Sequence, residues 1–262
     1  KTLPPRYRRK LTPKQSNFFK PPVTTPSQRK TPTGQQPRLN LFELCLPILL
    51  PPAKTDSGSD LVMPGTLYPF QNFGVKWLAE HDSALLADAP GTGKTIQAIT
   101  AFRLLVRQGK AIQCLIICPK SVVSSWRQHL KEWAPELQVA TVGGSKDARQ
   151  FQWAAYTGKV HAIVTNYDLL RNDFESAAKH VFDLVIADEV SNIKNHGSQT
   201  SQVVRKVQAK RKWGMTGTPL ENRPEDVVAI MSFIKPGLFS HEALTHVDPQ
   251  EVREKIGLLN LF

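Results

Sequence analysis

A short glycine-rich segment between two stretches of regular structure constrains the fold of this chain more than any other feature. Residues 88–95 read DAPGTGKT; an apolar run of strand length precedes them at 83–87, and a segment with helix-period apolar positions follows and ends in Gly109. Gly91 and Gly93 allow backbone N–H groups to approach a ligand that any Cβ would hold away. A strand, a glycine loop and a helix in this order aim the helix N-terminus at whatever the loop holds.

The same loop has the residues needed to hold a polyphosphate. The backbone of Gly91, Thr92 and Gly93 is suited to wrap phosphate oxygens. Lys94 then reaches the outer phosphates, and Thr95 offers a hydroxyl to Mg²⁺. The stricter pattern GxxxxGK[ST] begins with a glycine where this chain has an aspartate, so the prediction rests on GTGKT and its flanking elements. The alternative at this point is a chance match in an ordinary loop.

A pair of acids follows a second apolar strand, in VIADEVSNIKN at 185–195. Asp188 is suited to hold Mg²⁺, usually through water molecules, and Glu189 to orient and deprotonate an attacking water. Taken alone, the pair is equally the solvated start of a loop. Its position downstream of GTGKT favours a site that hydrolyses a nucleotide.

A third stretch, GMTGTPLENR at 214–223, again follows a strand. Thr216, Gly217 and Thr218 place two hydroxyls and a flexible backbone beside the other two loops. Read alone, this is a capping turn with Pro219 opening a helix. In order with the other two stretches, it indicates an element that couples the nucleotide to a second ligand.

The rest of the chain alternates apolar runs of strand length with helix-period segments beyond Leu67. Several strands are apolar on both faces, as a parallel sheet covered by helices requires. We therefore expect an α/β fold: a doubly wound, mostly parallel sheet with helices on both faces and the chemistry in loops at the strand C-termini. The segments are QCLIIC, VVSSWRQHLKEW, QVATV, VHAIVT, FDLVIAD and KRKWGMT.

Residues 1–66 differ from the rest in composition. They carry 11 Lys or Arg against 3 Asp or Glu, a net charge of +8 out of the total of +12, and 12 of the 20 prolines. Such segments bury too little apolar surface to offset chain entropy, so we expect a largely disordered, basic extension. Its function is open between a contact with nucleic acid and a solvated linker.

Other sequence features exclude some protein classes. No apolar run approaches the roughly 18 residues of a membrane span, and no secretory signal is visible, so we expect an intracellular protein with no membrane partner. Cys45, Cys114 and Cys118 form no CxxC pair; the last two are expected as reduced core residues of one strand. The chain begins with Lys1, which suggests a fragment or a processed product.

Three further stretches complete a recognisable series: LYPFQNFGVKWLAE at 67–80, LIICPKSVVSSWRQHLKEW at 115–133 and IVTNYDLL at 163–170. With the first three, they make the chain resemble the first RecA-like lobe of a Swi/Snf-type ATPase of helicase superfamily two, over residues 67–240. This resemblance implies ATP and Mg²⁺ as ligands, translocation along double-stranded DNA without base specificity, and a nucleoprotein target. Residues 241–262 would begin the connection to a second RecA-like lobe in cis.

The resemblance also implies roles for individual residues. Gln71 would select adenine, with Phe70 or Tyr68 near the base; we also expect Phe70, Phe73 and Trp77 to pack along their helix. Residues in two further motifs would contact the backbone of one DNA strand. These are Pro119, Lys120 and Ser121, then Thr165, Asn166 and Tyr167. By its period, Trp126 is expected to anchor a helix face rather than to stack on a base.

The chain departs from the family pattern in two places. Where the family has DEAH or DEAQ, this chain ends the motif in Val190 and Ser191, which leaves open how the acidic pair is coupled to the TGT segment. Nothing resembles the second lobe, which supplies an arginine finger worth roughly 10³ to 10⁵ in turnover. We therefore expect this chain to bind ATP but to hydrolyse it slowly.

Two other functions are compatible with the sequence. One is a stand-alone module that binds nucleotide, DNA or a protein without useful turnover. The other is an unrelated P-loop NTPase, such as a nucleotide kinase, although Gln71 and TGTP argue against it. The expected location is DNA-associated, with a prokaryotic cytoplasm or nucleoid, or a virus-infected cell, favoured over a nucleus.

Overall fold

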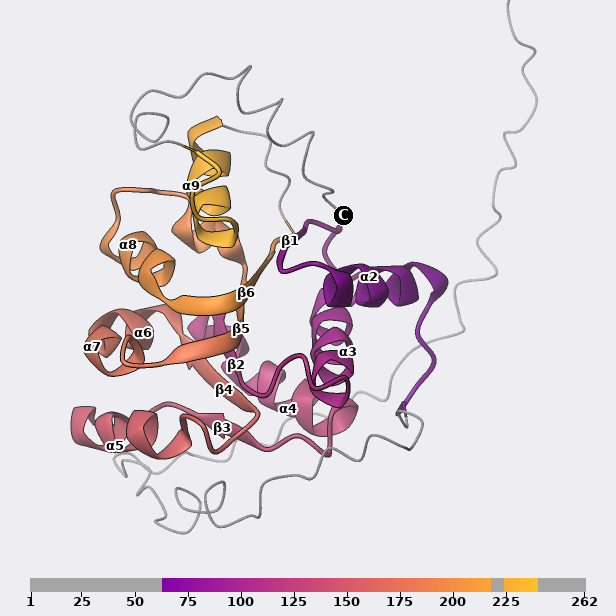
Figure 1. The fold of residues 1–262 in the computed structure, drawn as a ribbon, viewed down its shortest axis with the longest axis horizontal. Coiled ribbons are helices and arrows are strands. Elements are labelled where there is room, and N and C mark those ends of the chain that lie inside the picture. The colour runs from indigo at the N-terminus through magenta and orange to yellow at the C-terminus, as the bar shows by residue number, and fades with distance from the viewer. Residues whose placement is uncertain (1–62, 218–223, 240–262) are drawn as a thin grey trace, which may run out of the picture. The chain divides into compact units, whose positions relative to one another are not determined.

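The strands of the described residues form one six-stranded sheet in which every pairing is parallel (Figure 1). The computed structural model describes residues 63–217 and 224–239. The strand order is β1-β6-β5-β2-β4-β3. The strands are β1 (Ser83–Leu86), β2 (Cys114–Cys118), β3 (Val139–Thr141), β4 (Ala162–Asn166), β5 (Val181–Asp188) and β6 (Gln208–Met215). Most of the predicted extension, Thr218 and the predicted connection after residue 240 lie outside the described residues.

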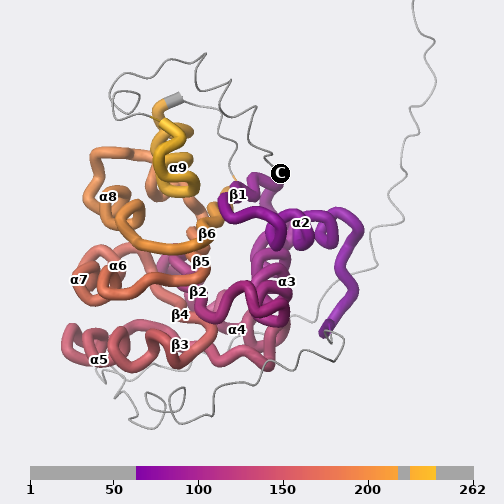
Figure 2. The backbone as a smooth tube through the Cα atoms, viewed as in Figure 1, coloured from indigo at the N-terminus to yellow at the C-terminus, as the bar shows by residue number. Residues whose placement is uncertain are grey.

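Helices cover both faces of this sheet, which confirms the predicted α/β class (Figures 1 and 2). One face carries α2 (Pro69–Glu80), α3 (Lys94–Arg107) and α4 (Val123–Trp133). The other carries α5 (Lys146–Tyr156), α6 (Tyr167–Asn172), α7 (Phe174–Ala177), α8 (Gln199–Lys206) and α9 (Pro224–Ile234). Within the described ranges, no helix is long and apolar enough to span a membrane.

Each central strand contributes to two cores, because successive side chains point to opposite faces. In β2, Leu115 packs with the α5 to α9 layer, and Ile116 packs with the α2 to α4 layer. Cys114 and Cys118 are buried free thiols of this strand, as predicted. A strand that is apolar throughout is therefore the expected pattern for the middle of this sheet.

Local signals set the helix boundaries. Gly93 has a positive φ of 79° immediately before α3, and Gly109, at φ 67°, follows its end, as predicted from the sequence. Asn166 caps α6 and Ser198 caps α8, each side chain accepting a hydrogen bond from a backbone N–H. Because all strands are parallel, the loops after β1, β2, β4, β5 and β6 open at one edge of the sheet.

The prediction that three aromatic residues pack along α2 was wrong for two of them. Trp77 is 9% exposed, but Phe70 and Phe73 are 44% and 56% exposed. The buried stripe of α2 runs through Gln71, Val75 and Leu78, at helical spacing. Phe70 and Phe73 lie off this stripe and keep about half of their surface exposed.

Candidate functional site

The glycine loop joins β1 to α3 at the carboxyl edge of the sheet. Gly91 and Gly93 have φ values of 84° and 79°, a backbone region that L-residues with a Cβ rarely adopt. A Cβ on Gly93 would also lie 2.5 Å from Nε2 of Gln71. The backbone at position 93 therefore favours glycine, and a side chain there would also displace the Gln71 amide from its place on the loop.

The lysine of the loop folds back over its own backbone. Lys94 Nζ donates hydrogen bonds to the carbonyl oxygens of Asp88 at 2.7 Å and Ala89 at 3.0 Å. Thr92 Oγ1 donates to the same Ala89 oxygen at 2.9 Å. Lys94 and Thr95 are both partly exposed at the start of α3. The ammonium can therefore exchange two carbonyl oxygens for the oxygens of a phosphate without leaving the loop.

Gln71 connects α2 to this loop. Its Nε2 donates to the carbonyl oxygen of Thr92 at 2.9 Å, and its Oε1 accepts from the backbone N–H of Tyr68 at 3.0 Å. An amide side chain has two N–H donors and two oxygen lone pairs, so one of each remains for the edge of a base. The exposed rings of Tyr68 and Phe70 stack beside it, with centroids 5.9 Å apart. Adenine selection by Gln71 stays a prediction, and this geometry is compatible with it.

A second glutamine, which the sequence patterns did not single out, also contacts the glycine loop. Gln97 is fully buried in α3, and its Nε2 lies 3.3 Å from Oδ2 of Asp88 and 3.5 Å from the Thr92 carbonyl oxygen. Both contacts are long for hydrogen bonds. Gln71 of α2 and Gln97 of α3 therefore both approach the carbonyl oxygen of Thr92.

The acidic pair lies where β5 ends. Asp188 Oδ2 accepts a hydrogen bond of 2.7 Å from the indole Nε1 of Trp126, and Oδ1 accepts one of 3.0 Å from the backbone N–H of Glu189. Burial raises the pKa of the Asp188 carboxyl above its ordinary value, while these two hydrogen bonds act in the opposite direction. Trp126 is 1% exposed, so it is the predicted helix anchor. Its contact with Asp188 was not predicted.

Glu189 has an unusual backbone and two hydroxyl partners. Its φ of 50° is the sole positive value at a non-glycine residue in the described part of the chain. Its Oε1 accepts hydrogen bonds from Ser191 Oγ at 2.6 Å and from Thr216 Oγ1 at 3.2 Å. Backbone strain of this kind concentrates at functional sites. The Glu189 carboxylate joins the acidic pair to the third stretch through Thr216, and Ser191 holds the same carboxylate oxygen.

The third stretch also contacts the glycine loop. A Cβ on Gly217 would lie 3.1 Å from Cγ of Pro90 and 3.5 Å from Nζ of Lys94. Tyr167, the first residue of α6, adds another link, because its hydroxyl donates to the Asp188 carbonyl oxygen at 2.8 Å. Burial raises the pKa of this Tyr167 hydroxyl well above its ordinary value, so it remains a donor. The described parts of the three sequence stretches thus meet around Lys94.

The donor set at this place suits Mg²⁺. The Thr95 hydroxyl and the Asp188 carboxylate are hard oxygen ligands, and Mg²⁺ typically takes one or two protein oxygens together with phosphate and water. Lys94 is near enough to lower the Asp188 pKa through its charge, so the phosphate-binding and carboxylate groups share one site. No cluster of three or more His, Cys, Asp or Glu that could hold a metal occurs among the described residues.

The residues predicted to contact DNA fall into two sets. Lys120 and Ser121 are exposed in a short 3₁₀ helix after β2, beside the partly exposed Pro119. The side chains at the end of β4 are instead buried: Thr165 is 0%, Asn166 7% and Tyr167 6% exposed. Only the first set presents side chains to solvent.

Comparison with known proteins gives one family. Residues 70–248 match the family described as the SNF2-related domain. Helicase domino of Drosophila melanogaster is 32% identical over 205 residues, which cover 73% of this chain and 6% of that protein. The ISWI chromatin-remodeling complex ATPase ISW2 of Saccharomyces cerevisiae is 31% identical over 191 residues, 70% of this chain and 17% of its own length.

A solved structure shows the same fold. The Sulfolobus solfataricus SWI2/SNF2 ATPase core in complex with dsDNA aligns with a TM-score of 0.65 and 26% identity, over 76% of this chain and 45% of that chain. This chain therefore spans less than half of that core and less than a fifth of the two curated relatives.

Proposed function

Because this chain belongs to the SNF2-related domain family, a group of helicase-like ATPases that includes Swi/Snf proteins, we propose that residues 67–240 are the ATP-binding and ATP-hydrolysing lobe of a DNA-dependent translocase. One observation carries this proposal. Lys94 follows the glycine loop, Glu189 follows β5 and Thr216 follows β6, yet the three segments form one site. Thr216 donates a hydrogen bond to Glu189, and the neighbouring Gly217 lies against Pro90 and Lys94. The family match removes the unrelated P-loop NTPase from consideration.

The residues of the site divide the work of ATP hydrolysis. Backbone N–H groups of the loop, the N-terminus of α3 and Lys94 would hold the phosphate oxygens. Thr95 and Asp188 would hold Mg²⁺, which when bound neutralises charge on the β- and γ-phosphates. Trp126 and the Glu189 N–H fix both oxygens of the Asp188 carboxylate, so its orientation does not depend on solvent.

In this proposal, Glu189 acts as the general base. A water oxygen attacks the γ-phosphorus, the bond to the bridging oxygen breaks to leave ADP, and the water proton passes to the Glu189 carboxylate. Ser191 and Thr216 both donate to Oε1. In the described part of the chain, no hydrogen bond to Oε2 of Glu189 is seen, so we assign Oε2 as the oxygen that accepts the water proton.

We infer that the coupling to DNA runs through the same carboxylate. Thr216 belongs to the stretch expected to sense a second ligand, and it donates directly to the base. Lys120 and Ser121 are exposed at the same edge of the sheet and are suited to contact phosphates of double-stranded DNA. At Thr165, Asn166 and Tyr167, contact would come from the backbone, because the side chains are buried.

Further parts of the proposal concern segments beyond this site. A second RecA-like lobe would supply the arginine finger, so we expect slow turnover by this chain alone. The basic residues 1–66 remain either a nucleic-acid contact or a linker. A DNA-associated place inside the cell, and a nucleoprotein target, follow from the proposal.

The test separates binding from turnover. Mg-ATP binding is measured by calorimetry on this chain, and ATP hydrolysis is measured with and without duplex DNA on this chain and on a version extended through its downstream reading frame. We expect binding in both proteins, DNA-stimulated hydrolysis in the longer one, and loss of hydrolysis with retained binding in Glu189→Gln.

Two results would overturn the proposal. A folded chain that binds no Mg-ATP at millimolar concentration has no nucleotide site. Binding without any turnover in either length, or turnover indifferent to DNA and to Glu189→Gln, would leave the stand-alone binding module in its place. Lys110→Ala, an exposed lysine just after α3, serves as the charge-matched control for Lys94→Ala in the binding assay.

A further inference from the structure

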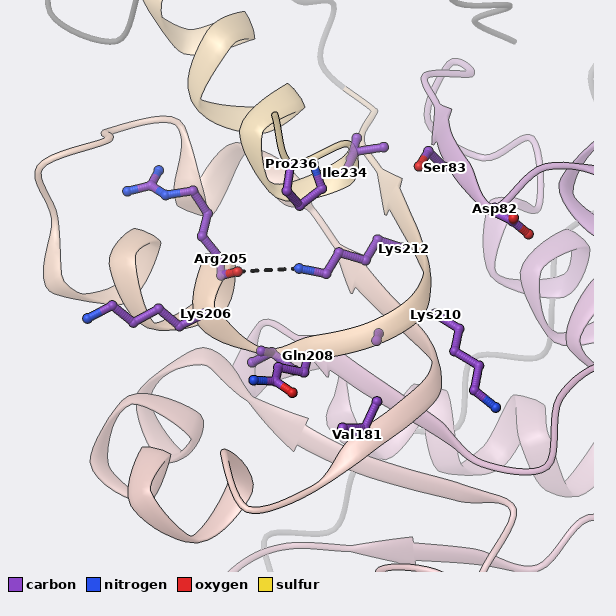
Figure 3. Close-up of a pocket in the computed structure, with 12 residues that line it drawn as sticks. Asp82, Ser83, Val181, Arg205, Lys206, Gln208, Lys210, Lys212, Ile234 and Pro236 are labelled. Atoms are coloured by element: carbon purple, nitrogen blue, oxygen red, sulfur yellow. Dashed lines mark hydrogen bonds between the residues drawn. The ribbon is translucent and has the colours of Figure 1, made fainter. Parts of the chain in front are cut away.

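A cavity lies at the edge of the sheet opposite the glycine loop. Its volume is about 410 Å³, and it is bounded by the amino-terminal ends of β1, β5 and β6 together with the ends of α8 and α9 (Figure 3). Val181 and Ile234 contribute apolar wall, and Arg205, Lys206, Lys210 and Lys212 contribute positive charge. A volume in this range is that of a site for a small organic molecule.

Lys212 is the charged side chain that crosses this cavity (Figure 3). It is 7% exposed, its Nζ donates one hydrogen bond of 3.3 Å to the carbonyl oxygen of Arg205, and it lies 5.2 Å above the ring centre of Phe233. An ammonium has three N–H donors, and one long bond to a neutral carbonyl uses one of them. Among the described residues, no hydrogen-bond acceptor is seen for its other two donors.

Apart from the exposed Lys206, the other charged groups around the cavity have partners of their own. Arg205 donates to Ser201 Oγ at 2.7 Å and to the His196 carbonyl oxygen at 2.6 Å, Lys210 pairs with Asp183 at 2.8 Å, and Asp82 pairs with Arg211. No carboxylate of the described residues pairs with Lys212. Burial lowers the pKa of Lys212 to about 8, because no negative charge offsets the lost hydration.

We propose that this cavity is a binding site for a small organic anion, whose carboxylate or phosphate oxygens accept hydrogen bonds from Lys212. An anion would supply both a hydrogen-bond acceptor for the Lys212 ammonium and the negative charge that its surroundings lack. Val181 and Ile234 are placed to contact its hydrocarbon part, and Lys206 at the rim attracts it. The site is distinct from the nucleotide site, which lies at the other edge of the sheet, and does not depend on the proposed hydrolysis.

The experiment titrates the protein with two probes, inorganic phosphate and hexanoate, at constant ionic strength with chloride as the balance, and follows backbone amide NMR signals. We expect saturable shifts at residues 205–212. The dissociation constant should rise at least about tenfold in Lys212→Met, because a charge-assisted hydrogen bond is lost. It should change by less than about twofold in Lys206→Met, which removes the same charge from the exposed rim.

Lys94→Ala separates this site from the glycine loop, which also binds phosphate in our proposal. Saturable shifts at 205–212 that persist in Lys94→Ala support the cavity; hexanoate alone would assign a carboxylate ligand, and phosphate alone a phosphate. Shifts confined to residues 88–95, shifts that rise linearly without saturation, or equal affinity in Lys212→Met would overturn the proposal. If Lys212→Met does not fold, the location and saturation of the wild-type shifts decide the question.

Discussion

Replacing Lys212 with methionine should show how much the buried ammonium group lowers the free energy of unfolding. Burial lowers the pKa of Lys212 from its ordinary value of 10.5 to about 8. Each pH unit between these values corresponds to about 1.4 kcal/mol, so the charged side chain destabilises the folded state by about 3 kcal/mol at pH 7. Methionine fills a similar volume without the charge, so Lys212→Met should be more stable than the wild type at pH 7.

The sign of the pH dependence follows from the same shift. The folded state holds this proton less tightly than the unfolded chain, so the unfolded chain binds more protons between pH 8 and pH 10.5. Wild-type stability therefore gains from this group as the pH rises through that window, and the penalty falls to about 1.4 kcal/mol at pH 9.5. The advantage of Lys212→Met should accordingly shrink by about 2 kcal/mol between pH 7 and pH 9.5.

The assay is urea unfolding, followed by tryptophan fluorescence at several pH values, in a buffer without phosphate or carboxylate. Groups elsewhere titrate in both proteins and cancel in the difference between their unfolding free energies. Lys206→Met is the matched control, because it removes the same charge from an exposed position in the lining of the same cavity. A difference for Lys212→Met that changes by less than about 0.5 kcal/mol across the range would refute the reasoning.

Three further predictions concern the glycine loop, the acidic pair and a buried thiol. Gly93→Ala should destabilise the fold by about 1 kcal/mol more than Gly158→Ala, because both have positive φ but only the Cβ at position 93 would displace the Gln71 amide from its hydrogen bonds; equal losses in urea unfolding would contradict this. Trp126→Phe removes the hydrogen bond to the Asp188 carboxylate and should weaken ATP binding about tenfold with Mg²⁺ but not without it. Equal weakening in both calorimetric titrations would mean a merely structural role. Burial and the nearby Asp188 charge raise the pKa of Cys118 to about 12, so at pH 8 only about 10⁻⁴ of it is thiolate. Mass spectrometry should find this peptide unalkylated by iodoacetamide in the native protein and alkylated in urea; rapid native labelling would refute the assignment.

Local patterns in the sequence predicted the elements and their order well. The apolar CLIIC became β2, and the helix-period segment after the glycine loop became α3, which ends before Gly109 as expected. These predictions succeed because strand and helix periods, and the tolerance of glycine for positive φ, are properties of short stretches of chain. The loop with Gly91 and Gly93 was recognised for the same reason.

The burial of individual side chains was predicted less well. The spacing of apolar residues indicates which face of a helix is buried, but it does not indicate how much of that face the neighbouring element covers. Phe70 and Phe73 were expected to pack along α2, yet the stripe that α3 covers passes beside them. Thr165 and Asn166 end β4 and Tyr167 begins α6, a place where residues that bind a ligand often lie, but their side chains are buried in the protein. Which face a neighbour covers is decided by packing between elements.

The sequence by itself determined the parallel α/β class, the glycine loop for which we propose phosphate binding, and the presence of an acidic pair. Tertiary structure decided how they are joined: the order β1-β6-β5-β2 places the end of β6 between the glycine loop and the acidic pair. This order lets Thr216 reach Glu189 across 27 residues of sequence, and it lets Trp126 reach Asp188 across 62. Hydrogen bonds depend on distance and direction in space, and no local period encodes the partner of a side chain so far away along the chain.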